Sequence, residues 1–181
     1  MMRSSAQQES SPTKIVLGFD PGALRTGYAV VAYGDGGFSL LESGVIHIPR
    51  RDMKYNEYRR EIQRQWFDLF PNMVWVNKPD QIYSEMLPIT GGAAVQRVLG
   101  LGMVITCQTL ALEKGIPWEE VSAITVKKRV TGSHKATKPK VRDAVIAVFP
   151  ELQQRKKELT GIWEESDAIA IALTGAGYVI D

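Results

Sequence analysis

Four acidic residues in this chain have the types and spacing that divalent-metal chemistry requires. Asp20 and Glu85 each lie at or near the end of a short apolar segment with the character of a β-strand. Glu164 and Asp167 are three residues apart near the start of a helical segment, so their side chains share one helix face about 5–6 Å apart. If the two strands are parallel neighbours, Asp20 and Glu85 lie at the same sheet end, where open α/β sheets bind ligands. Glu165 lies about 200° around the helix from Asp167 and should face elsewhere.

Carboxylate oxygens without an adjacent His or Cys are typical ligands of hard cations. Such a set favours Mg²⁺, with Mn²⁺ as a substitute, over zinc. Two such ions about 3.5–4 Å apart are a common apparatus for phosphodiester hydrolysis, in which one activates the attacking water and the other stabilises the leaving oxygen. The pattern therefore predicts a metal site for hydrolysis at Asp20, Glu85, Glu164 and Asp167.

The same acids also have a structural interpretation. Asp20 precedes Pro21 and Gly22 and could serve as a turn residue. The acids within residues 164–167 could form a charge cluster that stabilises the start of a helix. Glu85 fits this interpretation poorly, because burying an unpaired carboxylate in an apolar strand costs free energy. Spacing alone leaves both interpretations open.

A basic segment, residues 126–142, holds the strongest concentration of charge in the chain. It contains seven Lys and Arg residues and no acid, and the small polar residues at its centre, 132–138, predict a flexible loop. Such a loop can neutralise a phosphate backbone, although most charge runs are only solvated surface. The predicted DNA-binding residues are Lys127, Lys128, Arg129, His134, Lys135, Lys138 and Lys140.

The overall composition is that of a globular protein of 181 residues. The formal net charge of +2 does not exclude a nucleic-acid partner, because the bases are concentrated in one segment and the acids in the expected site. One cysteine and two histidines exclude a disulfide framework and a Cys- or His-rich metal centre. No apolar run reaches the roughly 18 residues of a membrane span. We expect residues 1–13 to be a disordered tail, with organelle targeting as a weaker alternative, residues 14–181 to form one domain, and the location to be cytoplasmic.

Apolar periodicity predicts the elements that position these residues. The short turns between the first three strands require an antiparallel meander. The helix over residues 92–114 is apolar nearly all round, which indicates that it is covered on two sides. The order βββαβαβαα predicts an α/β three-layer sandwich, with a mixed five-stranded sheet of antiparallel strands 1–3 plus parallel strands 4 and 5, and helices on both faces. The expected strands are residues 14–19, 27–33, 38–48, 81–87 and 118–123, and the expected helices are residues 54–70 (closed by Pro71), 92–114, a segment ending at Phe149, and 163–174.

Taken in order, these residues resemble the RuvC family of Holliday-junction resolvases, within the RNase H-like nuclease superfamily. The likeness extends over about residues 14–175, nearly the whole chain. Four segments carry it in the family's order: the first-strand motif (IVLGFDPG, continuing to TGY), the second acidic strand (IYSE), the basic stretch (VK, GS and Lys138) and the closing helix (DAIAIA).

The resemblance implies an RNase H-like fold and a homodimer that binds a four-way DNA junction and nicks two opposed strands with Mg²⁺ during recombination and repair. It implies that Lys127 and Lys138 contact phosphates near the scissile bond, and that the dimer covers the helix around residues 92–114. It also implies that the catalytic residues and metal ligands are Asp20, Glu85, Glu164 and Asp167.

Two departures from the family pattern leave selectivity open. Glu164 stands where the family commonly has Asp, and Met86, Leu87 and Pro88 lack the aromatic residue that often stacks at the junction centre. The alternatives are therefore a broader branched-DNA nuclease of the kind some phages encode, a YqgF-type RNA-processing nuclease, and a junction-binding protein without catalysis. An ATPase of the actin and sugar-kinase kind is the least favoured alternative, because the chain is too short for its two lobes.

Overall fold

The structure is a computed structural model in which residues 13–22, 24–49, 52–87 and 94–180 are described. The predictions for the tail over residues 1–12 and for the start of the second helix at Gly92 lie outside these residues.

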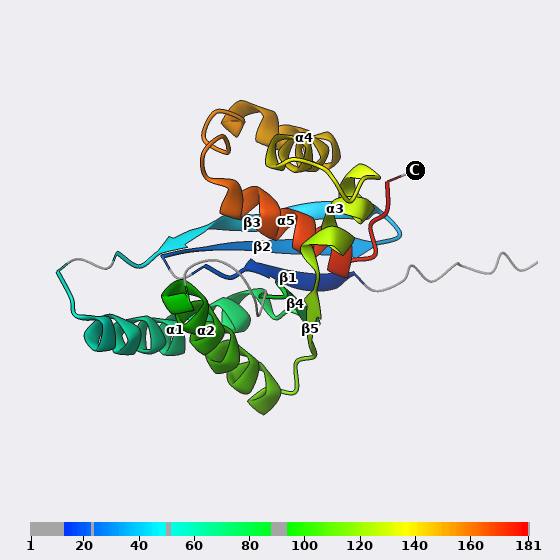
Figure 1. Ribbon diagram of the computed structural model, residues 1–181. Helices are drawn as coiled ribbons and strands as arrows, with labels where there is room; N and C mark the ends of the chain where they lie inside the picture. The colour runs from blue at the N-terminus through cyan, green and yellow to red at the C-terminus, as the bar shows by residue number, and fades with distance from the viewer. Residues whose placement is uncertain (1–12, 23, 50–51, 88–93, 181) are drawn as a thin grey trace, which may run out of the picture.

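A mixed five-stranded sheet forms the centre of the fold (Figure 1). Its strands are β1 (Lys14–Asp20), β2 (Arg25–Gly34), β3 (Gly37–His47), β4 (Gln81–Glu85) and β5 (Trp118–Val121). The first three form an antiparallel meander, and β4 and β5 add to β1 in parallel, in the order β3-β2-β1-β4-β5. Phe19 pairs with Ser84, so the C-terminal ends of β1 and β4 lie at the same edge of the sheet. This topology confirms the predicted sheet, although β4 and β5 each end two residues earlier than expected.

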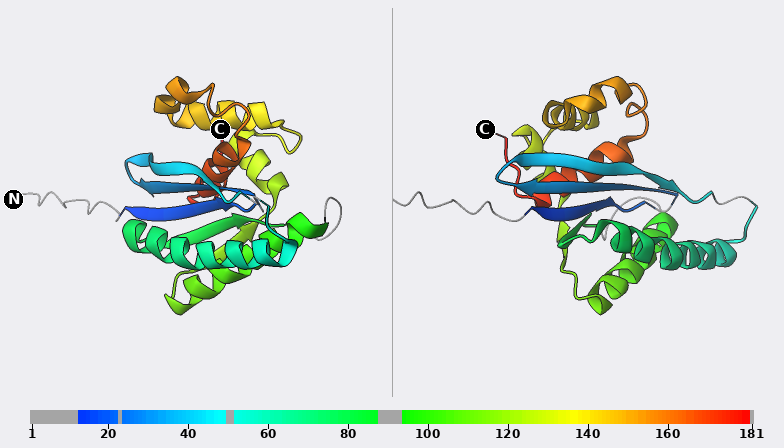
Figure 2. Two further views of the ribbon diagram at one scale, coloured as in Figure 1. Left: turned by 90° about the vertical axis from the view of Figure 1, so that its left-hand side faces the viewer. Right: turned by 180° about the vertical axis from the view of Figure 1, so that it is seen from behind.

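Helices cover both faces of the sheet (Figures 1 and 2). Helices α1 (Tyr55–Asn77) and α2 (Ala94–Glu113) lie on one face. Helices α3 (Ala123–Thr131), α4 (Lys138–Val148) and α5 (Trp163–Gly175) lie on the other, and a short 3₁₀ helix, η1 (Pro150–Arg155), follows α4. The predicted three-layer sandwich is therefore confirmed. None of the helices in the described part of the chain is long and apolar enough to cross a membrane.

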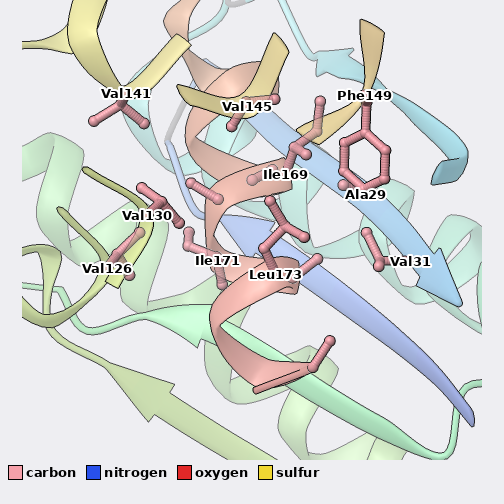
Figure 3. Packing of buried hydrophobic residues seen from close by; sticks show 14 of the residues in the cluster. Ala29, Val31, Val126, Val130, Val141, Val145, Phe149, Ile169, Ile171 and Leu173 are labelled. Carbon is pink, nitrogen blue, oxygen red and sulfur yellow. The ribbon is translucent and has the colours of Figure 1, made fainter. Parts of the chain in front are cut away.

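The side chains of β1 alternate between two hydrophobic cores, one on each face of the sheet. The same alternation determines the face on which the last side chain of β1 lies. Leu17 and Phe19 belong to the core under α1 and α2, whereas Val16 belongs to the core around α5. Figure 3 shows the second core, in which Ile169 and Leu173 of α5 lie among side chains of β2, α3 and α4. Since successive side chains of a strand point to opposite faces, Asp20 lies on the α5 face of the sheet.

Helix α5 packs directly on the sheet backbone because two strand positions are glycine. A Cβ on Gly18 would come within 2.6 Å of the Ala168 carbonyl oxygen and 2.7 Å of the Ala172 nitrogen. A Cβ on Gly27 would overlap the carbonyl oxygen of Glu164. The first turns of α5 therefore rest on β1 and β2, beside the end of β1 that carries Asp20.

We expect Gly18→Ala to destabilise the fold by about 1–3 kcal/mol, because the added methyl group must push α5 away from β1. Urea denaturation followed by circular dichroism measures the change. Gly36→Ala is the matched control, since a Cβ at Gly36, in the turn between β2 and β3, meets nothing within 4 Å. Equal unfolding midpoints for the two variants would contradict this account of how α5 is seated.

The end of α1 differs from its prediction. The sequence predicted a helix over residues 54–70 closed by Pro71, but α1 continues through Pro71 to Asn77. Proline removes the hydrogen bond to the carbonyl of Phe67, and Phe67 is 60% exposed, so water can satisfy that carbonyl. The helix ends where Lys78 adopts the left-handed conformation (φ 44°) and its N–H donates to the Val74 carbonyl at 2.8 Å.

The basic segment also differs, because much of it is helical. Residues 123–131 form α3, and only residues 132–137 connect it to α4. Ser122 caps α3 by accepting the Thr125 N–H at 3.1 Å, and Gly132, at φ 73°, ends it. The predicted loop over 132–138 therefore extends one residue too far, because α4 begins at Lys138. The basic residues 127–129 lie on α3.

Candidate active site

Three of the four predicted acids meet in one pocket at the shared end of β1 and β4. Asp20 is the last residue of β1, Glu85 is the last residue of β4, and Asp167 lies near the start of α5. They line a pocket of about 190 Å³ together with Lys127 of α3 and Lys138, the first residue of α4. Parallel pairing of β1 with β4 and the seating of α5 on glycine bring the three carboxylates together, and α3 and α4 supply the two lysines.

Glu164 lies near this pocket but not in its lining. Its carbonyl packs against Gly27, and its negative charge contributes to the raised pKa of Asp20. Its Oε2 atom is buried and has no hydrogen-bond partner among the described residues. A buried carboxylate oxygen without a partner is costly, so this atom favours a donor or a cation that the polypeptide itself does not supply.

The two lysines of the pocket do not fully offset the repulsion among its acids. Burial, together with the charges of Glu85 and Asp167, raises the pKa of Asp20 from 3.8 to about 8, and Lys138 offsets only part of this effect. Burial and the charge of Asp167 also raise the pKa of Glu85, against the opposing charges of Lys138 and Lys127. Carboxylates that repel one another in this way are stabilised by additional cationic charge.

Lys138 holds one of these acids in an ion pair. Its Nζ donates to Oδ2 of Asp167 at 2.7 Å. Burial opposes the charged form of Lys138, but its bond to Asp167 and the charges of Asp20 and Glu164 outweigh burial and raise its pKa. The ammonium group is therefore charged at neutral pH and stands at the edge of the acidic pocket.

The remaining predicted DNA-binding residues do not line the pocket. Lys128, His134, Lys135 and Lys140 are exposed on α3, the 132–137 connection and the start of α4. Arg129 donates from Nη1 to the Thr174 carbonyl at 3.4 Å, so it points to the C-terminal end of α5, whereas Asp167 lies near the start of that helix.

Glu165 faces away from the pocket, as its helical position predicts. Glu165 is 5% exposed, and its carboxylate accepts hydrogen bonds from Arg155 of η1 at 3.0 and 3.1 Å and from Ser43 Oγ of β3 at 2.7 Å. These contacts fix the first turn of α5 between β3 and η1. Sequence reasoning missed Ser43 and Arg155, and Ser43 lies 122 residues from Glu165, so no local pattern could reveal their contact.

The donor set fits a hard metal ion, although the side chains are not arranged around one. Among residues 13–22, 24–49, 52–87 and 94–180, no three Asp, Glu, His or Cys side chains are close enough to hold a metal ion together. The pocket nevertheless offers only carboxylate oxygens, which hard divalent cations prefer. The unpaired oxygen of Glu164 and the raised pKa of Asp20 both favour an added cation. To bind such a cation through Oδ2, Asp167 would have to break its ion pair with Lys138.

In the absence of metal, the contribution of Asp20 should make folding stability fall as the pH rises. Between pH 3.8 and about 8 the native state binds a proton at Asp20 that the unfolded state has released. This contribution is complete below pH 3.8 and is lost as the pH rises through about 8. Asp20→Asn should therefore raise the melting temperature by several degrees at pH 8 in EDTA, and by less at pH 5. Asp52→Asn, at an exposed position, is the control; a D20N variant with the wild-type pH dependence would contradict the prediction.

The fold and the acids define a class of protein. A sheet in the order β3-β2-β1-β4-β5 with helices on both faces is the arrangement of the RNase H-like fold, and in this chain acids lie at the ends of β1 and β4 and at the start of α5.

Comparison with known sequences identifies the family within that class. The family model described as crossover junction endodeoxyribonuclease RuvC matches residues 16–175. The RuvC of Chlorobium phaeovibrioides is 33% identical over 165 residues, which cover 88% of this chain and 79% of the relative. The RuvC of Saccharophagus degradans is 30% identical over 163 residues, which cover 88% of this chain and 85% of the relative. The chain belongs to the RuvC family.

Solved structures confirm the expected fold. The RuvC of Thermus thermophilus superposes with a TM-score of 0.67 at 22% identity, over 90% of this chain and 93% of that one. The yeast mitochondrial Holliday junction resolvase superposes with a TM-score of 0.61 at 14% identity, over 91% of this chain and 78% of that one. At these identities the likeness shows the shared fold alone.

Proposed function

We propose that this protein is a metal-dependent endodeoxyribonuclease that binds four-way DNA junctions as a homodimer and nicks paired strands. One observation carries the proposal: in a member of the RuvC family, Asp20, Glu85 and Asp167 line one pocket with Lys127 and Lys138. The relatives are named crossover junction endodeoxyribonucleases, and the Thermus thermophilus RuvC has been solved in complex with a Holliday junction substrate. The same substrate class is therefore expected here, in the cytoplasm.

The residues that would hold Mg²⁺, or Mn²⁺ in its place, are Asp20, Glu85, Glu164 and Asp167. Glu164 is preferred over Glu165, because Arg155 and Ser43 already bond the carboxylate of Glu165, whereas Glu164 Oε2 has no partner among the described residues. The bound metal supplies Lewis-acid stabilisation of the phosphate and activation of a water molecule.

The two lysines of the pocket orient the substrate. If Asp167 held a metal ion in place of the Lys138 ammonium, Lys138 would be free to donate to a phosphate oxygen at the same site. Lys127 lines the pocket from α3 and offers a second cation to the same phosphate. The exposed bases on α3, the 132–137 connection and the start of α4 extend this positive surface along the DNA backbone.

The dimer is expected to form through an exposed apolar stripe on α2. Val98, Leu101, Ile105 and Leu112 are 53%, 50%, 52% and 79% exposed. At 100° per residue they fall on one side of the helix, opposite the buried side chains of Leu99, Met103 and Cys107. A second copy of this face would cover the stripe, as the two-sided apolar pattern of the sequence suggests.

A broader branched-DNA nuclease is the second candidate. Glu85 is followed by Met86, which is 51% exposed, and neither Met86 nor Leu87 is aromatic. Stacking against bases at the junction centre, which would favour four-way DNA, is therefore not supplied from these two positions.

Cleavage of labelled substrates distinguishes the candidates. Four-way junctions, three-way junctions, flaps and structured RNA are incubated with the protein and Mg²⁺ or Mn²⁺, and the cuts are mapped. The proposal predicts paired, symmetric cuts in the four-way junction. Equal cleavage of three-way DNA would favour the broader nuclease, cleavage of RNA alone would favour the YqgF-type activity, and binding without cleavage in either metal would overturn the enzymatic proposal.

A further inference from the structure

A second pocket lies at the other end of the sheet from the acids. Its walls are Phe70, Val74 and Trp75 of α1, Leu110 of α2, and Ile116 before β5. It encloses about 360 Å³. Pro79, just before the start of β4, also lines it, so the pocket lies near the N-terminal ends of the parallel strands, whereas the catalytic acids lie at their C-terminal ends. The proposed nuclease activity makes no use of it.

The pocket exposes large apolar groups to solvent. Trp75 is 79% exposed, and the adjacent Val76 is 71% exposed. Trp66, by contrast, is 1% exposed, in the core between the sheet and helices α1 and α2. An exposed tryptophan beside an apolar concavity is typical of a protein-binding surface, because tryptophan supplies much of the binding energy at such interfaces.

Two lysines complete the pocket. Lys78 and Lys114 are both in its lining, and no acid is. Neither has an ion-pair partner within the described part of the chain. The left-handed backbone of Lys78 is fixed by its bond to the Val74 carbonyl. An occupant that matches this lining therefore combines an apolar side chain with carboxylates.

The pocket faces away from the proposed dimer stripe. At 100° per residue, Leu110 lies about 150° around α2 from the centre of the stripe formed by Val98, Leu101, Ile105 and Leu112, and Lys114 follows directly after the end of the helix. A second copy seated on that stripe leaves this pocket open.

A nucleic-acid occupant also fits poorly. Asp80 and Glu113 adjoin the lining residues Pro79 and Lys114, and both are exposed. A nucleic-acid strand carries a phosphate at every nucleotide and binds through many Lys and Arg side chains, whereas this lining offers only Lys78 and Lys114. A short acidic segment with one apolar anchor needs only these two cations and the apolar walls.

We propose that this pocket docks a partner protein through a short acidic segment with an apolar anchor. The anchor, a Phe or Leu side chain, fills the space between Phe70 and Leu110 against the ring of Trp75. The flanking carboxylates pair with Lys78 and Lys114. Because the pocket and the catalytic acids lie at different ends of the sheet, the partner holds the enzyme without covering its DNA-binding face.

The test measures binding of labelled peptides to the full-length protein by fluorescence anisotropy. The probes are the acidic peptide acetyl-DDLFDD-amide, the same peptide with GS in place of LF, the basic peptide acetyl-KKLFKK-amide, and a 20-nucleotide single strand. We expect only the first to bind with a dissociation constant below 1 mM. The double variant Lys78→Asp/Lys114→Glu should weaken it at least tenfold, and aspartate is chosen at position 78 because it tolerates the left-handed backbone.

Matched controls separate this surface from the nuclease. Lys78→Asp/Lys114→Glu should leave the rate of junction cleavage within about twofold of wild type, whereas Lys135→Glu/Lys140→Glu should weaken DNA binding and leave peptide binding intact. No binding of the acidic peptide at 1 mM, or binding unaffected by the double variant, overturns the proposal. Binding of the single strand that this double variant abolishes would assign the pocket to nucleic acid, and a change of oligomeric state in Trp75→Ala would assign it to contacts between copies.

Discussion

Glu85→Gln should reduce junction cleavage on the order of 10³-fold or more, without weakening junction binding. The amide keeps the size of the side chain but removes the charge that would help to hold the metal. Because Glu85 lines the pocket with Lys127 and Lys138, loss of its charge also removes repulsion toward a phosphate. Affinity measured in Ca²⁺ or EDTA should therefore be unchanged or slightly tighter. Single-turnover cleavage in Mg²⁺ and a gel-shift titration provide the two measurements.

The control for this variant is Glu151→Gln. Glu151 is exposed on η1, away from the pocket lining, and its variant should cleave at the wild-type rate. A Glu85→Gln enzyme that keeps a tenth or more of the wild-type rate would remove Glu85 from the catalytic set. Loss of junction binding together with cleavage would instead show that the substitution disturbs the fold.

Leu101→Glu combined with Ile105→Glu should convert the proposed homodimer into a monomer that does not make the proposed paired cuts. Both side chains lie in the exposed stripe of α2, so the charges remain hydrated in a monomer but would be buried in a dimer. Burying unpaired carboxylates costs several kcal/mol, which weakens association by orders of magnitude. Sedimentation velocity should show a species near 20.1 kDa. Nicks at the two opposed strands should become uncoupled.

Leu41→Glu provides the matched control for this pair. Leu41 is a leucine of β3 that is 54% exposed and lies outside the stripe. This variant should remain dimeric and continue to cut in pairs. A dimer that persists in the double α2 variant would place the interface on another surface.

The proximity of Asp20, Glu85 and Asp167 could be predicted from the sequence pattern. Period-two alternation places Asp20 and Glu85 on one face of the sheet, and the short turns of the meander leave the first strand's other edge free for the fourth. The 3.6-residue repeat separates Glu165 from the face of Asp167, and the structure agrees. What the sequence did not display is that Lys138 pairs with Asp167, or that Glu164 lies beside the pocket and not in its lining, because both depend on how α4 and α5 pack.

The errors in the secondary structure have local physical causes. Pro71 was interpreted as the end of a helix, but the hydrogen bond that it removes lies at an exposed residue, Phe67, where the loss costs little. The apolar residues Met73, Val74 and Val76 after it are consistent with continuation of the helix. Helix α3 had visible signals in Ser122 as a cap, Val126 and Val130 four residues apart, and Gly132 as a stop. Residues 126–142 were interpreted by their charge, and these signals were not used to predict a helix.

Because α5 packs against the backbone at Gly18 and Gly27, these two positions tolerate substitution less well than the other positions of the core. Side chains elsewhere in the core can be exchanged for others of similar volume, at a cost in stability, while the carboxylates keep their spacing. Any side chain at the two glycines lifts the helix and moves Glu164 and Asp167 relative to Asp20. Over evolutionary time the spacing of the acids can therefore survive many substitutions in the core, provided that positions 18 and 27 remain glycine.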